Sequence, residues 1–127
     1  MHPFRAAVEA GDIGAAVALF SDEVVFHSPV AFTPYRGRAA VEVVLRAVVE
    51  VFEDFRYERE IGAPGGADHA LVFTARIGER RVEGCDFLHH DAGGAIDELT
   101  VMVRPLSGLA ALAEAMKAKL ASRAGPA

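Results

Sequence analysis

The sequence predicts an α+β domain in which helices pack on one face of an antiparallel sheet. Apolar residues recur at helical spacing in the first part of the chain and again at its end. Between them, from about residue 55 to residue 104, apolar and polar residues alternate with the period of a strand, and glycine-containing turns interrupt the pattern. Helices followed by such a meander are typical of the α+β class. We expect one domain over residues 1–127, because no repeat or linker divides the pattern.

Two short helices are expected first. Residues 4–10 are followed by Gly11, which is typical of a helix C-terminus, and Asp12 is suited to cap the next helix. The apolar face of this second helix reaches Phe20 at helical spacing. The two helices should form a helical hairpin.

A strand and a long helix follow. The strand is the apolar run 24–26, and it ends in His27 and Ser28 before a proline-punctuated loop. Such a loop is a common place for a functional side chain, because the scaffold can aim it into a cavity. Residues 38–54 repeat apolar side chains at i, i+3, i+4 and i+7 over several turns, which predicts a helix.

Four strands and a closing helix complete the chain. We expect strands at 55–61, 71–77, 80–90 and 96–104, with turns at 63–67, 78–79 and 91–94. Pro105 opens a helix whose apolar side continues to Leu120. The last residues, 122–127, should fray.

Composition argues against several classes of protein. The net charge of −5 is spread along the chain without a basic cluster, so no nucleic-acid partner is expected. Cys85 is the single cysteine, which excludes an internal disulfide. The sequence has no signal-peptide pattern and no run of about 20 apolar residues. We therefore expect a soluble cytoplasmic protein with no membrane partner, and a small apolar molecule as its ligand.

Four stretches of the sequence resemble one known superfamily. They are FRAAVEAGD, VVFHSP, the YRG that precedes the long helix, and GCDFLHHDAGG. Together they resemble the nuclear transport factor 2-like superfamily and, within it, the SnoaL-like group, which includes polyketide cyclases; the likeness to ketosteroid isomerases is more distant. The resemblance covers nearly the whole chain. It implies a cystatin-like conical barrel, in which a strongly bent antiparallel sheet wraps around the N-terminal helices and the long helix, with a closing C-terminal helix. This scaffold hosts many activities, so the resemblance is specific for fold and not for reaction.

The resemblance also allows the residues of the ketosteroid isomerases to be compared with this chain. Their general base lies just before the proline that ends the first strand, where this chain has Ser28, and a serine hydroxyl cannot be that base. Their enolate-stabilising tyrosine and protonated aspartic acid correspond to Phe4, which has no hydroxyl, and to Asp86, which keeps the carboxyl. Steroid isomerisation by that mechanism is therefore not expected. Limonene-epoxide hydrolases have an arginine two residues before one aspartate, where this chain has Gly84, so their mechanism is not expected either.

Asp86 is the first candidate for a catalytic residue. Strand alternation places it on one face with Val82 and Leu88. If that face looks into the cavity, desolvation disfavours the charged carboxylate and makes Asp86 a candidate general acid or base near neutral pH. The alternative is a structural carboxylate that bonds a backbone amide or a tyrosine to hold the strands.

His27 is the second catalytic candidate, because an imidazole at the pocket mouth could exchange a proton with Asp86 or orient a ligand carbonyl. The alternative is a histidine that bonds the loop, since alternation points His27 away from the face shared by Phe26 and Ser28. The residues expected to contact the substrate are Phe4, Ser28, Phe32, Tyr35, Phe52, Phe55, Tyr57, Phe73, Leu88, Leu99 and Val101.

No metal or cofactor is expected. His89 and His90 are adjacent on a strand and point to opposite faces, so they cannot readily bind one ion together with Asp86. The stretch GAPGGA lacks the lysine and hydroxyl residue that follow in a phosphate-binding loop.

Two classes of function stay open. The first is a small enzyme that cyclises or isomerises an apolar, cyclic, carbonyl-containing metabolite through proton transfer at Asp86. The second is a non-catalytic ligand-binding or adaptor module of the same fold. In both cases we expect a homodimer through the outer face of the sheet, because a moderately apolar sheet face seldom stays exposed. That face is formed by Cys85, Phe87, Thr100 and Met102.

Overall fold

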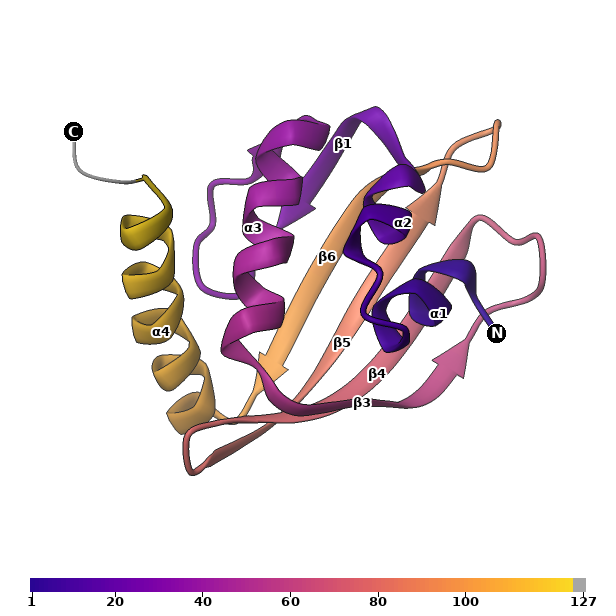
Figure 1. The fold of residues 1–127 in the computed structure, drawn as a ribbon. Helices are drawn as coiled ribbons and strands as arrows, with labels where there is room; N and C mark the ends of the chain where they lie inside the picture. The colour runs from indigo at the N-terminus through magenta and orange to yellow at the C-terminus, as the bar shows by residue number, and fades with distance from the viewer. Residues whose placement is uncertain (125–127) are drawn as a thin grey trace.

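One curved sheet carries helices on its inner face (Figure 1). The structure, a computed structural model, describes residues 1–124. The helices are α1 (Pro3–Glu9), α2 (Ile13–Ala18), α3 (Arg38–Val51) and α4 (Leu106–Ala124). The strands are β1 (Phe20–His27), β2 (Tyr35–Arg36), β3 (Glu53–Ile61), β4 (Asp68–Ile77), β5 (Arg80–His90) and β6 (Ile96–Arg104). These elements confirm the α+β class predicted from the sequence.

The strands lie in the order β2-β1-β6-β5-β4-β3, so the sheet is open and its edges are β2 and β3. The neighbouring strands are antiparallel except β1 and β6, which run parallel with Phe26 beside Leu99 and His27 beside Thr100. This pair differs from the wholly antiparallel sheet that was expected. The difference arises because α3 and the meander from β3 to β6 bring the chain back to β1 in the same direction.

The two N-terminal helices are both capped by side chains. The ring Nδ1 of His2 accepts the backbone N–H of Phe4 at 3.0 Å, and Oδ1 of Asp12 accepts that of Ala15 at 3.0 Å. The helix α2 ends before Phe20, which is the first residue of β1 and not part of the helix as predicted. The Phe20 ring is buried and lies 5.9 Å from that of Phe4, between centroids. An apolar position at this point suits a strand as well as a helix.

The long helix α3 ends at Val51, before the predicted end at residue 54. Phe52 already has an extended backbone, and β3 begins at Glu53. The guanidinium of Arg76 on β4 binds the carboxylates of Glu53 and Asp54, each at 2.6 Å. These ion pairs hold the start of β3 against β4. The apolar stripe continues past the helix because residues of the strand face the same core.

The core lies between the inner face of the sheet and the helices. On β5, Asp86 and Leu88 are buried while Phe87 between them is partly exposed, as strand parity predicts. Gly84 shares the buried face, and a Cβ at this position would overlap the ring of Phe73. Glycine therefore allows an aromatic side chain of β4 to lie against the backbone of β5.

The closing helix α4 lies beside α3 (Figure 1) and buries Leu112 and Met116. It extends to Ala124, so residues 122–124 of the segment expected to fray are helical, and residues 125–127 lie outside the described residues. Within residues 1–124, no helix has the length and apolar character needed to cross a membrane.

Candidate functional site

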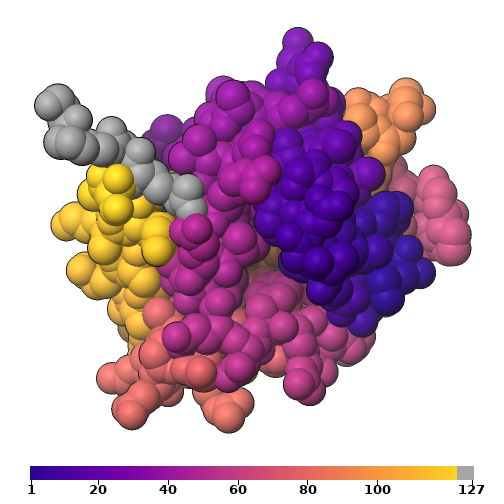
Figure 2. Space-filling view, viewed as in Figure 1, coloured from indigo at the N-terminus to yellow at the C-terminus, as the bar shows by residue number. Residues whose placement is uncertain are grey.

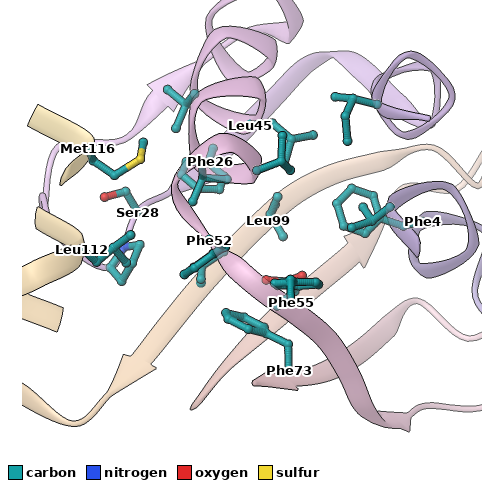
Figure 3. A pocket seen from close by; sticks show the side chains of 18 of the residues that line it. Phe4, Phe26, Ser28, Leu45, Phe52, Phe55, Phe73, Leu99, Leu112 and Met116 are labelled. Atoms are coloured by element: carbon teal, nitrogen blue, oxygen red, sulfur yellow. The ribbon is translucent and has the colours of Figure 1, made fainter. Parts of the chain in front are cut away.

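A cavity of about 660 Å³ lies between the inner face of the sheet and the helices. Figure 3 shows it from close by, with Phe4 entering from α1, Phe73 from β4, and Leu112 and Met116 from α4. In the space-filling view, α1, α2 and α3 cover much of this face of the sheet (Figure 2). The lining is mostly apolar and includes, of the residues singled out from the sequence, Phe4, Ser28, Tyr35, Phe52, Phe55, Tyr57, Phe73, Asp86, Leu99 and Val101.

Aromatic rings form one wall of the cavity. Phe55 stacks on Phe73 with 4.9 Å between ring centroids, and Phe52 lies 5.4 Å from Phe73 and 5.6 Å from Phe55. The ring of Tyr57 stands perpendicular to that of Phe55 at 4.9 Å. The rings contact one another without filling the space in front of them. Packed aromatic rings offer a ligand a large, fixed apolar surface.

Asp86 brings a carboxyl into this apolar surrounding. It lies in the middle of β5, paired with Leu71 of β4 and Val101 of β6, and only 8% of the residue is exposed. The hydroxyl of Tyr57 donates a hydrogen bond to Asp86 Oδ2 at 2.8 Å. Burial raises the pKa of Asp86 from 3.8 to about 7, and the Tyr57 hydrogen bond opposes this rise in part. The carboxyl can therefore change protonation state near neutral pH.

Tyr57 is the hydrogen-bond donor to this carboxyl, and its own proton is firmly held. Burial, and next the charge of Asp86, raise the pKa of the Tyr57 phenol above its ordinary value. The phenol keeps its proton when Asp86 ionises. The guanidinium carbon of Arg5 lies 5.9 Å from the centroid of the Tyr57 ring and so places a positive charge over its face.

The geometry bears on the two interpretations of Asp86. A carboxylate that only holds strands together is expected to accept hydrogen bonds from protein donors at both of its oxygens. Within residues 1–124, the Tyr57 hydroxyl is the one hydrogen-bond donor to the Asp86 side chain, and it occupies Oδ2. Asp86 also lines the cavity. The second oxygen, Oδ1, is thus left without a donor among the described residues.

Two charged residues that were not singled out from the sequence also line the cavity. Glu9, at the end of α1, binds Arg5 at 3.3 Å, and Arg56 of β3 lies between two aromatic neighbours in the chain. Both are exposed, so they belong to the opening of the cavity. Alternation gave no signal for Arg56, because it places this residue on the opposite side of β3 from Tyr57. The apolar stripes of α3 and α4 were the signal for a further part of the lining, which includes Val44, Leu45, Val48, Leu112, Met116 and Leu120.

Three predicted site residues lie outside the cavity, which corrects the expectation that they line it. His27 points to the outer face of the sheet, where its Nε2 lies 3.0 Å from Oε2 of Glu98. Phe32 is fully exposed, and Leu88 is buried away from the lining. Strand parity turns His27 outward, and the loop after Ser28 carries Phe32 into solvent.

Ser28 stays at the cavity, but its hydroxyl is engaged with the backbone. Its Oγ accepts the N–H groups of Val30 at 3.0 Å and Ala31 at 3.1 Å. These bonds hold the turn that follows β1. Ser28 is therefore a polar contact in the lining with its lone pairs already used.

Metal-ligating side chains do not gather in the cavity. Among residues 1–124, a cluster of three such side chains consists of His2, His69 and His90, and none of these lines the cavity. The polar groups that the cavity wall offers deep inside are the Asp86 carboxyl and the Tyr57 hydroxyl. Its chemistry is that of one acid–hydroxyl pair in an apolar wall.

Comparison with known proteins identifies relatives of this chain. The SnoaL-like domain family matches residues 2–99. A steroid delta-isomerase from Pseudomonas aeruginosa is 40% identical over 95% of this chain and 88% of its own, with a TM-score of 0.89. A protein from Silicibacter pomeroyi DSS-3, described as uncharacterized and conserved in bacteria with a cystatin-like fold, is 35% identical over 98% of this chain and 89% of its own, with a TM-score of 0.90.

A more distant structure extends the comparison of folds. The epoxide hydrolase/cyclase-like enzyme SalBIII, which acts in pyran ring formation in the polyether salinomycin, is 21% identical over 83% of this chain and 87% of its own, with a TM-score of 0.64. At that identity the likeness shows the fold alone. Among curated proteins there is no significant match. These findings confirm the cystatin-like fold expected from the sequence.

Proposed function

Because this chain belongs to the SnoaL-like family, we propose that it binds a small apolar, cyclic, carbonyl-containing metabolite in its cavity and transfers a proton to or from this ligand through Asp86. The observation that carries the proposal is the hydrogen-bonded pair of Asp86 and Tyr57, a carboxyl with a pKa of about 7 in an apolar wall. A steroid delta-isomerase at 40% identity supports a cyclic apolar ligand.

The dimensions of the cavity suit such a ligand. Its volume of about 660 Å³ lies within the ~300–1,000 Å³ typical of small-molecule sites. Its aromatic wall and sparse polar groups favour a molecule of steroid or aromatic-polyketide size over a highly charged one. We expect micromolar or weaker affinity for probes of this class.

The proton chemistry follows from the two states of Asp86. In its protonated form the carboxyl donates a hydrogen bond to the ligand's carbonyl oxygen and returns its proton to the enolate that the ionised form has generated. In its ionised form it accepts a proton from the carbon beside that carbonyl. Tyr57 holds Oδ2 in both states, so Oδ1 is the oxygen that faces the ligand. Enolisation of this kind is a step common to isomerisation and cyclisation.

The proposal differs from the mechanism of the ketosteroid isomerases. Ser28 stands where the resemblance places their general base, and its Oγ is engaged by two backbone N–H groups. Phe4 stands where they have a tyrosine. Only Asp86, assisted by Tyr57, supplies the proton-transferring group, so we do not propose double-bond isomerisation through a base on β1.

Hydrogen–deuterium exchange of a bound ketone tests the proposal without knowledge of the natural substrate. A panel of cyclic apolar ketones is incubated with the protein in D₂O, and loss of the proton signal beside the carbonyl is followed by NMR. We expect exchange to be catalysed, and Asp86→Asn to slow it by the ~10²–10⁴ typical of a general acid or base. Binding should stay within about tenfold of wild type, because the amide keeps the shape of the carboxyl.

The second candidate function is a non-catalytic ligand-binding module. The observation that favours it is the engagement of Ser28 by the backbone, which leaves Asp86 as the buried proton-transferring group in the cavity lining. The same experiment separates the two functions. Ketones that bind with micromolar affinity yet exchange no faster with wild-type protein than with Asp86→Asn would support the binding module and refute the enzyme.

A further inference from the structure

Three histidines from distant parts of the chain meet at the start of α1. His2 precedes the helix, His69 lies on β4, and His90 ends β5. Their ring centroids are 4.9 Å (His2–His69), 5.0 Å (His2–His90) and 5.2 Å (His69–His90) apart, which is close to an equilateral triangle. One ring nitrogen of each lies within 4.8 Å of the other two. Figure 1 shows the N-terminus beside the end of β3 at this corner of the molecule.

The size of this triangle matches a three-imidazole metal site. Zinc binds imidazole nitrogen at about 2.0–2.1 Å with tetrahedral angles, which places each ring centroid about 3.2 Å from the metal and any two centroids about 5.2 Å apart. The observed separations of 4.9–5.2 Å agree with this value. Ligand nitrogens in such a site lie about 3.3 Å apart, and Nε2 of His2 lies 3.0 Å from Nε2 of His90.

Hydrogen bonds prepare two of the three rings as ligands. His69 Nε2 lies 3.0 Å from the carbonyl oxygen of Gly66, and His90 Nδ1 lies 3.2 Å from that of Ala67. A carbonyl accepts only, so each of these nitrogens carries the proton, and His69 Nδ1 and His90 Nε2 keep their lone pairs. Metal-binding histidines are typically held in this way by a backbone carbonyl. A Cβ at Gly62 would lie 2.5 Å from His69 Nδ1, so glycine is what allows the His69 ring to pack this closely against residue 62.

His2 requires a rearrangement to become the third ligand. Its Nδ1 accepts the N–H of Phe4, so in the neutral ring Nε2 carries the proton and donates it to His90 Nε2. Coordination through Nε2 moves this proton to Nδ1 and breaks the bond to Phe4. Metal binding by His2 therefore competes with the cap of α1, the helix that brings Phe4 to the cavity.

We propose that His2, His69 and His90 bind one divalent transition-metal ion of the zinc class, which ties the start of α1 to β4 and β5. Imidazole nitrogens are ligands that suit zinc, copper and nickel, whereas magnesium and calcium prefer oxygen. The site is separate from the cavity and from Asp86, so it acts on the stability and position of α1. Sequence reasoning weighed the adjacent pair His89 and His90 and missed this set, because its members come from three segments.

The test uses full-length protein carrying no histidine tag. Cobalt(II) is titrated as the probe, since a tetrahedral nitrogen site gives it strong visible absorption, and zinc then displaces it. We expect one ion per chain. His69→Ala and His90→Ala should each weaken binding by more than the ~10–100-fold that loss of an outer-shell partner costs. The weakening should be smaller for His2→Ala. Metal binding by His2 in the wild-type protein breaks its hydrogen bond to the Phe4 N–H, and this cost reduces what His2 contributes to affinity.

The chain supplies matched controls in its two other histidines. His27 and His89 lie on the surface beside the carboxylates of Glu98 and Asp97, at 3.0 Å and 2.6 Å. His27→Ala and His89→Ala should leave binding unchanged. Loss of binding in these controls would overturn the proposal. So would wild-type protein that binds no ion at about 100 µM metal, because structural zinc sites bind their ion at concentrations far below this.

A measurement on wild-type protein decides the question if a cluster variant fails to fold. Nitrogen-15 NMR of the histidine rings identifies which nitrogen binds zinc. We expect coordination at Nδ1 of His69 and Nε2 of His90. Zinc shifts confined to His27 or His89, or the opposite nitrogens of His69 and His90, would refute the site.

Discussion

Replacing Asp86 with asparagine should remove a loss of stability that the wild-type protein suffers as the pH rises. The native carboxyl keeps its proton up to about pH 7, whereas aspartate in the unfolded chain ionises near pH 3.8. Between these values the native state binds more protons than the unfolded state, so the free energy of unfolding falls with increasing pH. An amide does not titrate in this range, so Asp86→Asn lacks this loss.

The magnitude follows from the two pKa values. At about 1.4 kcal/mol per pH unit, the rise from 3.8 to about 7 corresponds to about 4 kcal/mol. This is a large share of the ~5–15 kcal/mol by which typical domains are stable. The free energy of unfolding of Asp86→Asn minus that of wild type should therefore increase by about 4 kcal/mol from about pH 4 to pH 7.5. Any constant cost of the amide cancels in this comparison.

Urea unfolding of both proteins across this pH range measures the difference. Glu79→Gln is the control, because it removes an exposed carboxylate from the turn between β4 and β5; its difference from wild type should stay within about 0.5 kcal/mol. If the difference in unfolding free energy between Asp86→Asn and wild type is equally independent of pH, Asp86 ionises near its ordinary pKa. The desolvation argument, and with it the proposed acid–base role, would then be wrong.

Three further perturbations test other contacts. Tyr57→Phe removes the hydrogen bond that lowers the pKa of Asp86, so carbon-13 NMR should show this pKa rising further; an unchanged titration would contradict the pairing. Gly84→Ala places a methyl group against the Phe73 ring and should lower the free energy of unfolding by ~1–3 kcal/mol in urea; full stability would mean that the ring is not held there. Phe87 is 43% exposed on the outer face of the sheet, and if that face forms a homodimer, Phe87→Glu should shift the protein to monomer in analytical ultracentrifugation. Wild-type protein that sediments as a monomer at tens of micromolar would exclude this dimer.

The parts of the fold that depend on local periodicity could be predicted from the sequence. Alternation along β5 placed Asp86 on the buried face, and alternation along β1 pointed His27 away from the cavity. Helical spacing identified α3 but not its end, because the strand after it continues the apolar pattern. Phe20 was assigned to the wrong element for the same reason, since one buried phenylalanine fits a helix or a strand.

Contacts between distant segments could not be predicted. The choice of Tyr57 as the partner of Asp86 depends on the register that β4 sets between β3 and β5. Sequence reasoning offered a tyrosine as one possible partner but had no means to choose it. The meeting of His2 with His90 depends on where α1 lies against the sheet, which no local pattern specifies.

The parallel pairing of β1 with β6 has a consequence for how the protein folds. About 70 residues separate the two strands in the chain, so their contacts form across one of the longest loops available to it, and contacts of this kind slow folding. During synthesis, β1 is made before β3, β4 and β5, and it stays unpaired with β6 until these strands have been made. A nascent chain that stops before β6 leaves unpaired edges on both β1 and β5, which invites association with other chains. Leu99 and Val101 are also missing from such a chain, so the part of the cavity wall that β6 contributes is absent until this strand is made.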